Sequence, residues 1–143
     1  MKLWSNDFEE GQPIPARCSY RNENINPHIG WDDAPENTQS FALICNDPDA
    51  PVGDWIHWLL HGIPSGIREI PSGGKVPGVE VQNDFGVCHW GGPAPPFGTH
   101  RYFFTIYALS VPALENVHKN NFRELCEKHK LAVAQTMGTY TRK

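Results

Sequence analysis

The 143-residue sequence lacks the long apolar runs that membrane proteins need. No segment approaches the roughly 18 consecutive apolar residues of a membrane-spanning helix. The N-terminal stretch MKLWSNDFEEG also lacks the apolar core, about 7–15 residues long, that follows the lysine of a secretory signal. We therefore expect a cytoplasmic protein with no stable membrane anchoring.

An excess of basic residues is missing as well. The chain has 12 Lys and Arg against 16 Asp and Glu, which gives a formal net charge of −4. Domains that bind nucleic acids concentrate Lys and Arg on one face to neutralise phosphates, and no segment of this sequence does so. The composition predicts no nucleic-acid partner.

The four cysteines lack the spacing of a metal or redox motif. Cys18, Cys45, Cys88 and Cys126 are widely spread, and no CxxC pair occurs. We expect all four to be buried free thiols, as in proteins of a reducing compartment. Two disulfides remain the alternative for an oxidising compartment or a hyperthermophile's cytosol.

Helical periodicity is confined to one segment. In NNFRELCEKHKL, Phe122, Leu125, Cys126 and His129 recur at helical spacing, an asparagine can cap the start, and charges occupy the other face. Three other segments, residues 41–46, 55–63 and 102–109, are short, apolar and rich in aromatic and branched side chains. Each is bounded by Pro, Gly, Asn or Asp, which is typical of central strands.

Two weaker segments complete the predicted fold. Residues 76–82 (VPGVEVQ) predict an edge strand because Pro77 cannot donate to a ladder, and the C-terminal stretch LAVAQTMGTYTR alternates like a strand. With 13 Gly and 13 Pro, the chain is turn-rich but globular. We predict a single domain over residues 1–143, mostly β: an antiparallel sandwich with one or two helices in its C-terminal half.

The stretch DPDAPVGDWIHW, residues 47–58, gathers carboxylates, prolines and aromatic residues at the end of an apolar run. Pro48 and Pro51 fix φ and remove two backbone donors, so this segment must form a rigid bend that can hold Asp47 in one place. Ala50–Pro51 is a candidate cis peptide, because cis X–Pro bonds occur in tight turns.

The strand that follows this bend carries a histidine between two tryptophans. Strict alternation places Trp55 and His57 on one face and Trp58 on the other. His57 therefore has an aromatic neighbour and a polar bend beside it. A histidine that is simply hydrogen-bonded within the sheet is the structural alternative for this residue.

The stretch GGPAPPFGTHRYFFTIYAL, residues 91–109, joins a stiff Gly/Pro loop to a strand. His100 and Tyr102 share one face of that strand, as the wall of a small polar pocket requires, and Arg101 takes the other. Arg101 has two uses: it can bind an anion, or its planar guanidinium can pair with Asp49 or Asp47. Its position opposite His100 favours the structural pair.

These motifs together resemble the phosphatidylethanolamine-binding protein family, in its small bacterial and archaeal Raf-kinase-inhibitor-like branch. The resemblance rests on DPDAP followed by the HW pair, and on GPxPPxGxHRYxFxxYAL. FEEGQPIP, NINPHIGW, QNDFG and the C-terminal LAVAQTMGTYTR extend it over nearly the whole chain. It implies a large central antiparallel sheet packed on a smaller one, and it makes a homodimer the expected assembly.

The resemblance also implies a small surface pocket that binds phosphate, acetate or phosphorylated head groups. Carried over residue by residue, the ligand-binding residues would be Asp47, His57, Ala94, Pro95, Pro96, His100 and Tyr102. Pro48, Pro51, Asp49, Arg101 and Trp55 would support the pocket. No cofactor and no metal are implied.

We expect Asp47 to accept a hydrogen bond from His57. This contact would favour the imidazolium form, raise the pKa of His57 and orient its other nitrogen. Imidazoles, a phenol and loop N–H groups can then hold phosphate without a basic patch. Binding should tighten as the pH falls through the titration of His57.

Four functions are open to this sequence, one of which is a scaffold role in which the pocket is vestigial. The first is a non-enzymatic anion-binding regulator of a partner kinase or protease, which the resemblance implies; the sequence has no GxSxG, HExxH or Walker motif. The second is a hydrolase of small phosphates or esters that uses Asp47 and His57 as an acid–base pair. The third is a metal site made of Asp47, His57 and His100.

Overall fold

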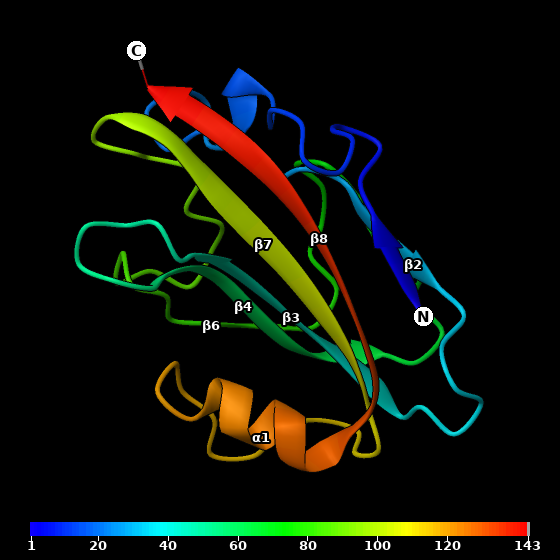
Figure 1. Cartoon of the computed structure of the whole chain (residues 1–143). Coiled ribbons are helices and arrows are strands. Elements are labelled where there is room, and N and C mark those ends of the chain that lie inside the picture. Colours follow the sequence, from blue (N-terminus) through cyan, green and yellow to red (C-terminus); the bar gives the residue numbers. More distant parts are fainter. Residues whose placement is uncertain (143) are drawn as a thin grey trace.

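The computed structural model describes residues 1–142, which form two antiparallel sheets and one α-helix. The larger sheet has the strand order β6-β4-β3-β7-β8 and the smaller one the order β1-β2-β5 (Figure 1). The strands of the larger sheet are β3 (Ser40–Asp47), β4 (Trp55–Pro64), β6 (Val79–Val81), β7 (Gly98–Leu109) and β8 (Lys130–Arg142). Those of the smaller sheet are β1 (Lys2–Trp4), β2 (Ile29–Asp32) and β5 (Glu69–Ile70); α1 is Phe122–His129, and a 3-10 turn spans Ala16–Cys18.

The predicted sandwich is confirmed, and so are its main elements. Each of the three central apolar segments is a strand, residues 79–81 form the expected edge strand, and the periodic segment is a helix. β7 begins four residues earlier than predicted because Gly98 to Arg101 pair with Arg142 to Thr139 of β8. This long β7–β8 ribbon carries residue 100 to the end of the sheet where β3 finishes and β4 begins.

The core lies between the two sheets. Alternate residues of β7, from Tyr102 to Ala108, face inward and pack against Trp31 and Phe41. On the outer face of the larger sheet, Tyr107 packs with Phe122 and Cys126 of α1. The alternation therefore sets the two faces of the larger sheet as the sequence predicts.

A β-bulge at residue 57 breaks this alternation in β4. Cys45 lies opposite Trp58 and Asn46 lies opposite Ile56, so His57 is an extra residue in the ladder. His57 and Trp58 both reach the inner face: the His57 ring is 5.2 Å from that of Tyr102, and the Trp58 ring 5.4 Å from that of Trp90. The prediction that Trp58 faces away from His57 is wrong for this reason.

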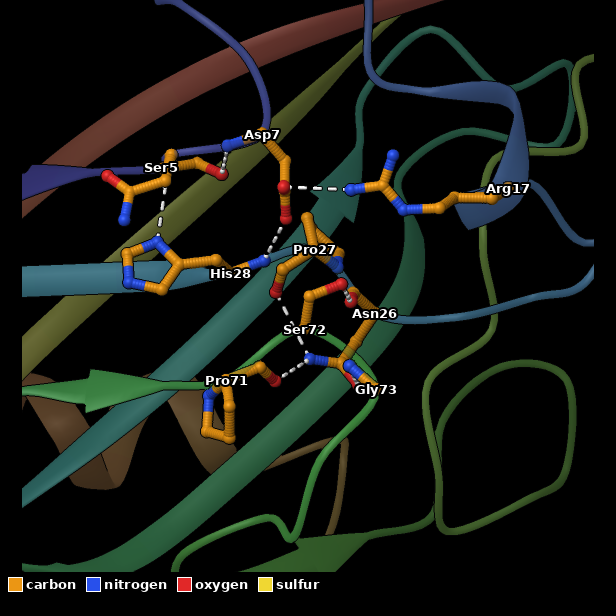
Figure 2. Close-up of polar contacts among 10 residues, drawn as sticks. Ser5, Asp7, Arg17, Asn26, Pro27, His28, Pro71, Ser72 and Gly73 are labelled. Atoms are coloured by element: carbon orange, nitrogen blue, oxygen red, sulfur yellow. Dashed lines mark hydrogen bonds and ion pairs between the residues drawn. The ribbon is translucent and has the colours of Figure 1, made fainter.

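A network of polar side chains, centred on the buried Asn26 and His28, ties the N-terminal segment to the smaller sheet (Figure 2). Asp7 accepts hydrogen bonds from Arg17 Nη2 at 2.8 Å and from the backbone N–H of His28 at 2.6 Å. The His28 ring uses both nitrogens, since Nδ1 accepts from Asn6 N–H at 3.0 Å and Nε2 lies 3.1 Å from Glu69 Oε1.

Asn26 continues the same network toward residues 71–73. Its Nδ2 donates to the carbonyls of Pro27 and Pro71, at 3.1 and 3.0 Å, and its Oδ1 accepts from Gly73 N–H at 3.2 Å (Figure 2). Ser72 Oγ donates to the Asn26 carbonyl at 3.0 Å. We call Asp7, Arg17, Asn26, His28 and Ser72 the Asn26 network.

All four cysteines are free thiols in the structure. Cys18, Cys45 and Cys126 are buried, and burial raises the pKa of Cys18 to about 11 and that of Cys126 to about 12. Cys88 is exposed, so the prediction of a buried thiol is wrong at that position. Across residues 1–142, no helix has the length and apolarity to cross a membrane.

Candidate functional site

A cavity of about 180 Å³ opens where β3 ends and where β4 and β7 begin. The loops after β3 and before β7 project from the same end of the larger sheet (Figure 1). The lining consists of two histidines, one carboxylate and seven apolar side chains: Asp47, Ala50, Pro51, Val52, Trp55, His57, Phe85, Ala94, Pro96 and His100. We call this cavity the Asp47 pocket.

Asp47 is the last residue of β3 and is 3% exposed. Its Oδ1 accepts a hydrogen bond from the Asp49 N–H at 2.8 Å, which fixes the bend. Its Oδ2 lies 2.7 Å from Nδ1 of His100. The expected hydrogen bond between Asp47 and His57 is absent from the structure, because His100 of β7 lies beside the carboxylate and binds it instead.

His57, 2% exposed, is held by the Gly/Pro loop instead. Its Nδ1 donates to the Gly91 carbonyl at 2.5 Å, and Gly91 N–H donates back to the His57 carbonyl at 3.2 Å. Because Nδ1 carries the proton, Nε2 of the neutral ring carries a lone pair. Burial lowers the pKa of His57, and the Gly91 carbonyl and the charge of Asp47 oppose that shift only in part. The prediction of a raised pKa is wrong because desolvation outweighs the carboxylate.

An aromatic wall completes the pocket. The Phe85 ring lies 5.2 Å from His57 and 5.5 Å from Trp55, edge-on to both. Asn83, which is 1% exposed, places Phe85: its Nδ2 donates to the carbonyls of His57 and His89, both at 2.9 Å, and its Oδ1 accepts from Phe85 N–H at 2.9 Å. Neither residue was predicted at the site; the only sequence signal was the QNDFG motif of the family resemblance.

The two glycines of the loop permit close approach. A Cβ on Gly91 would lie 2.3 Å from the Phe85 ring, and one on Gly92 would lie 1.9 Å from the carbonyl oxygen of Cys18. Asn24 secures the same loop, since its Oδ1 accepts from Gly92 N–H at 2.7 Å. Any side chain at these two positions would displace the carbonyl that orients His57.

Arg101 pairs with Asp49 on the outer side of the pocket, as the structural alternative predicted. Its Nε and Nη2 donate to the two Asp49 oxygens at 2.9 and 2.8 Å, and its backbone N–H donates to Oδ2 at 3.0 Å. These bonds lower the pKa of Asp49 to about 2, with the Arg101 side chain as the main cause. The bidentate pair locks the DPDAP bend to β7.

The prolines of the bend differ from expectation in two ways. The Ala50–Pro51 bond is trans, as are the other peptide bonds of residues 1–142. A trans proline suffices because Gly53 N–H donates to the Ala50 carbonyl at 2.9 Å and closes a turn with Pro51 at its second position. Pro51 lines the Asp47 pocket itself, whereas Pro48 lines a cavity on the outer face of the sheet.

The chain matches known proteins over nearly its whole length. The sequence model of the phosphatidylethanolamine-binding protein family matches residues 4–141. The chain belongs to this family. A UPF0098 protein of Methanothermobacter thermautotrophicus is 42% identical over 150 residues, covering 99% of both chains, and the UPF0098 protein YbhB of Escherichia coli is 43% identical over 129 residues, covering 80% of this chain and 82% of its own.

Solved structures of the family share the fold. A phosphatidylethanolamine-binding protein homologue of Chlamydia trachomatis superimposes with a TM-score of 0.93 at 33% identity and covers 99% of this chain and 97% of its own. YbcL of Escherichia coli, described as a member of the mammalian family, gives a TM-score of 0.92 at 29% identity, with 99% and 98% of the two chains covered.

The residues singled out by the family motifs are not all in one cavity. Asp47, His57, Ala94, Pro96 and His100 line the Asp47 pocket, together with the supporting Trp55. Pro95 lines a neighbouring cavity instead. Tyr102 is fully buried and is not part of the lining; its hydroxyl has no hydrogen-bond partner among residues 1–142, and burial together with the charge of Asp47 raises its pKa.

The Asp47 pocket also bears on the metal alternative. No three His, Cys, Asp or Glu residues between positions 1 and 142 are grouped to hold a metal ion, so Asp47, His57 and His100 do not form such a group. Nδ1 of each histidine is engaged by protein, at Gly91 and at Asp47. The arrangement suits hydrogen bonding to a ligand.

Proposed function

We propose that the Asp47 pocket binds a small oxyanion, with phosphate as the reference ligand, and that the protein acts as a non-enzymatic binding module. One observation carries the proposal. Two buried imidazoles meet in one cavity of about 180 Å³, and each has one nitrogen committed to the protein. Within residues 1–142 neither Nε2 has a hydrogen-bond partner.

The chemistry of these nitrogens couples binding to protons. A neutral His57 offers a lone pair at Nε2, which accepts a hydrogen bond from a phosphate that carries its own proton. A protonated His57 would donate to the anion instead. Because an anion stabilises the imidazolium, binding should draw a proton into the pocket, and affinity should rise as the pH falls.

The lining supports binding over hydrolysis. No Ser, Thr, Cys or Lys side chain is among the ten lining residues, so the usual nucleophiles are not at hand. Both oxygens of Asp47 already accept hydrogen bonds, from Asp49 and His100, which leaves the carboxylate less available as a base. Release of product from a chromogenic phosphate or acetate ester would favour the hydrolase alternative.

The biological role that we propose follows the family resemblance alone. In this role the protein is a homodimer that regulates a partner kinase or protease. Light scattering at several concentrations measures the oligomeric state, and a monomer at all of them would remove the dimer from the proposal.

The direct experiment is a calorimetric titration with inorganic phosphate at about pH 6. We expect heat with the wild type and with His118→Ala, which removes an exposed histidine far along the chain, and none with His57→Ala. Absence of heat in the wild type would refute anion binding. Equal heat in His57→Ala would place the anion elsewhere.

Sulfate separates the protein's proton from the ligand's. Sulfate keeps its charge over about pH 5 to 8, so any tightening on acidification must come from protein groups. We expect sulfate affinity to rise as the pH falls, and phosphate to bind more tightly than sulfate near neutrality because only phosphate can donate to His57 Nε2. An affinity that stays constant over this range would contradict the proton coupling.

A further inference from the structure

A second cavity, of about 260 Å³, lies on the other side of the Gly/Pro loop. Pro95 faces this cavity, Pro96 faces the Asp47 pocket, and Ala94 lines both. Ala94 is therefore the residue at which the two cavities adjoin.

The charges of the second cavity differ from those of the first. Its lining includes Arg21 and Arg142 and no carboxylate. Both arginines are exposed, and no carboxylate of residues 1–142 lies within ion-pair distance of either. Arg17, Arg101 and Arg123 each pair with an aspartate, whereas Arg21, Arg68 and Arg142 have no carboxylate partner among residues 1–142. Arg68 donates to the Ser65 and Ile67 carbonyls instead, and Arg21 and Arg142 line the same cavity.

The backbone holds both arginines beside this cavity. Arg21 lies in the turn after the 3-10 helix, where Tyr20 N–H donates to the Pro93 carbonyl at 3.0 Å and Asn22 N–H to the Ser19 carbonyl at 3.2 Å. Arg142 ends β8 opposite Gly98 of β7. Asn22 and Tyr140 also line the cavity, with Asn22 Nδ2 3.5 Å from the Tyr140 hydroxyl, and they add neutral polar groups to its lining.

We propose that the two cavities form one composite site for a small ligand with two linked phosphate groups. This inference rests on the proposed function, since the first phosphate occupies the Asp47 pocket. The second lies between Arg21 and Arg142, and the linkage passes Ala94. Arginine suits this role because its planar guanidinium binds phosphate oxygens bidentately, whereas the Asp47 pocket has only imidazoles to offer.

The test compares phosphate, pyrophosphate and tripolyphosphate as calorimetric ligands in metal-free buffer. We expect the longer anions to bind at least about tenfold more tightly than phosphate, the size of one charge-assisted contact. The shortest anion that shows this gain measures the span between the two cavities.

Variants that each remove one positive charge show which residues give polyphosphates their higher affinity. Arg21→Gln and Arg142→Gln should each remove most of the polyphosphate advantage and leave phosphate affinity within about twofold. Lys128→Gln is the matched control: it removes one positive charge from α1, and all of β8, roughly 40 Å of strand, lies between it and Arg142. Both arginines are exposed, so the variants should melt like the wild type.

Each contrary outcome has a distinct meaning. If polyphosphates bind no better than phosphate, or if the gain survives both arginine variants, the composite site is wrong and the Asp47 pocket stands. The composite site is equally wrong if the arginine variants weaken phosphate as much as tripolyphosphate. If phosphate does not bind at all, the proposed function fails and this inference falls with it.

Discussion

Two polar clusters in this protein each contain a buried histidine and a carboxylate, and their hydrogen bonds are arranged differently. In the Asn26 network, both oxygens of Asp7, both nitrogens of His28 and both polar atoms of Asn26 have partners within the chain. In the Asp47 pocket, His57 and His100 each use one nitrogen. The buried Tyr102 ring packs against His57 outside the lining, and its hydroxyl has no partner among residues 1–142.

The difference separates structure from site. A buried polar atom without a partner costs about 1–3 kcal/mol, and within residues 1–142 only Trp31 Nε1 in the core and the Tyr102 hydroxyl are of this kind. The free Nε2 atoms of His57 and His100 belong instead to residues that line a cavity, where a ligand can reach them. The Asn26 network joins the N-terminal segment to the loop at residues 71–73 and leaves nothing for a ligand. The pocket keeps unused acceptors beside a cavity. We therefore expect substitutions in the first cluster to change stability and those in the second to change binding.

The largest effect should come from Asn26→Ala. The substitution removes three hydrogen bonds and leaves the carbonyls of Pro27 and Pro71 and the Gly73 N–H without their partner. We expect the free energy of unfolding in urea to fall by about 3 kcal/mol. Asn120→Ala, at an exposed position, is the control and should change little. A loss below about 1 kcal/mol would show that water replaces this network.

The pocket should make the protein less stable in mild acid. Burial lowers the pKa of His57 and of His61, whose Nδ1 accepts from Leu114 N–H. The unfolded chain, with histidines near their usual value of about 6.5, then binds more protons than the folded one below that pH. The free energy of unfolding should fall as the pH drops below about 6.5. His57→Gln should flatten this slope; an unchanged slope would mean that His57 does not titrate on unfolding.

A smaller effect is expected at the Asp49–Arg101 pair. In Arg101→Gln the Asp49 carboxyl loses its main partner, so its pKa should rise from about 2 toward the usual value of about 3.9. Because the folded pKa is depressed, this pair stabilises the fold above about pH 4, and its contribution is lost as the pH falls toward 2. Carboxyl NMR titration measures the shift. An Asp49 that titrates identically in both proteins would show that the pair does not persist in solution.

The smallest effect should come from Tyr102→Phe. The ring under His57 stays, and only a hydroxyl with no partner among the described residues is removed. Because a buried hydroxyl without a partner costs free energy, its removal should raise the free energy of unfolding slightly, by about 1 kcal/mol. A clear loss of stability would mean that this hydroxyl is hydrogen-bonded in solution. The polar groups around the pocket would then be paired as fully as those of the Asn26 network.

The sequence predicted most of the fold because its strands are short, apolar and punctuated by Pro and Gly. Faces follow from alternation, and alternation holds along β7, so Tyr102 and Arg101 were assigned to the correct sides. It fails at residue 57, where one extra residue in β4 turns both His57 and Trp58 inward. Nothing local in WIHWLL marks that bulge; it is set by the pairing of β4 with β3.

The sequence predicted the residues of the candidate site better than it predicted their hydrogen-bond partners. Asp47, His57 and His100 were expected near one another, and they line one cavity. The register of β7 against β3 decides which histidine pairs with the Asp47 carboxylate. His57 pairs with the Gly91 carbonyl instead, and no side-chain motif in the sequence predicts a backbone partner. Phe85 and Asn83 were missed for a similar reason, because they reach the pocket on a loop from another part of the chain.

The most direct test of the two-cluster account is NMR of the histidine ring nitrogens with and without phosphate. In the free protein, His57 should be neutral with its proton on Nδ1, as its bond to Gly91 requires. Adding phosphate should shift the Nε2 resonances of His57 and His100 and leave both nitrogens of His28 unchanged. If the His57 resonances do not shift, or if those of His28 shift as much, phosphate does not bind selectively through the histidines of the Asp47 pocket.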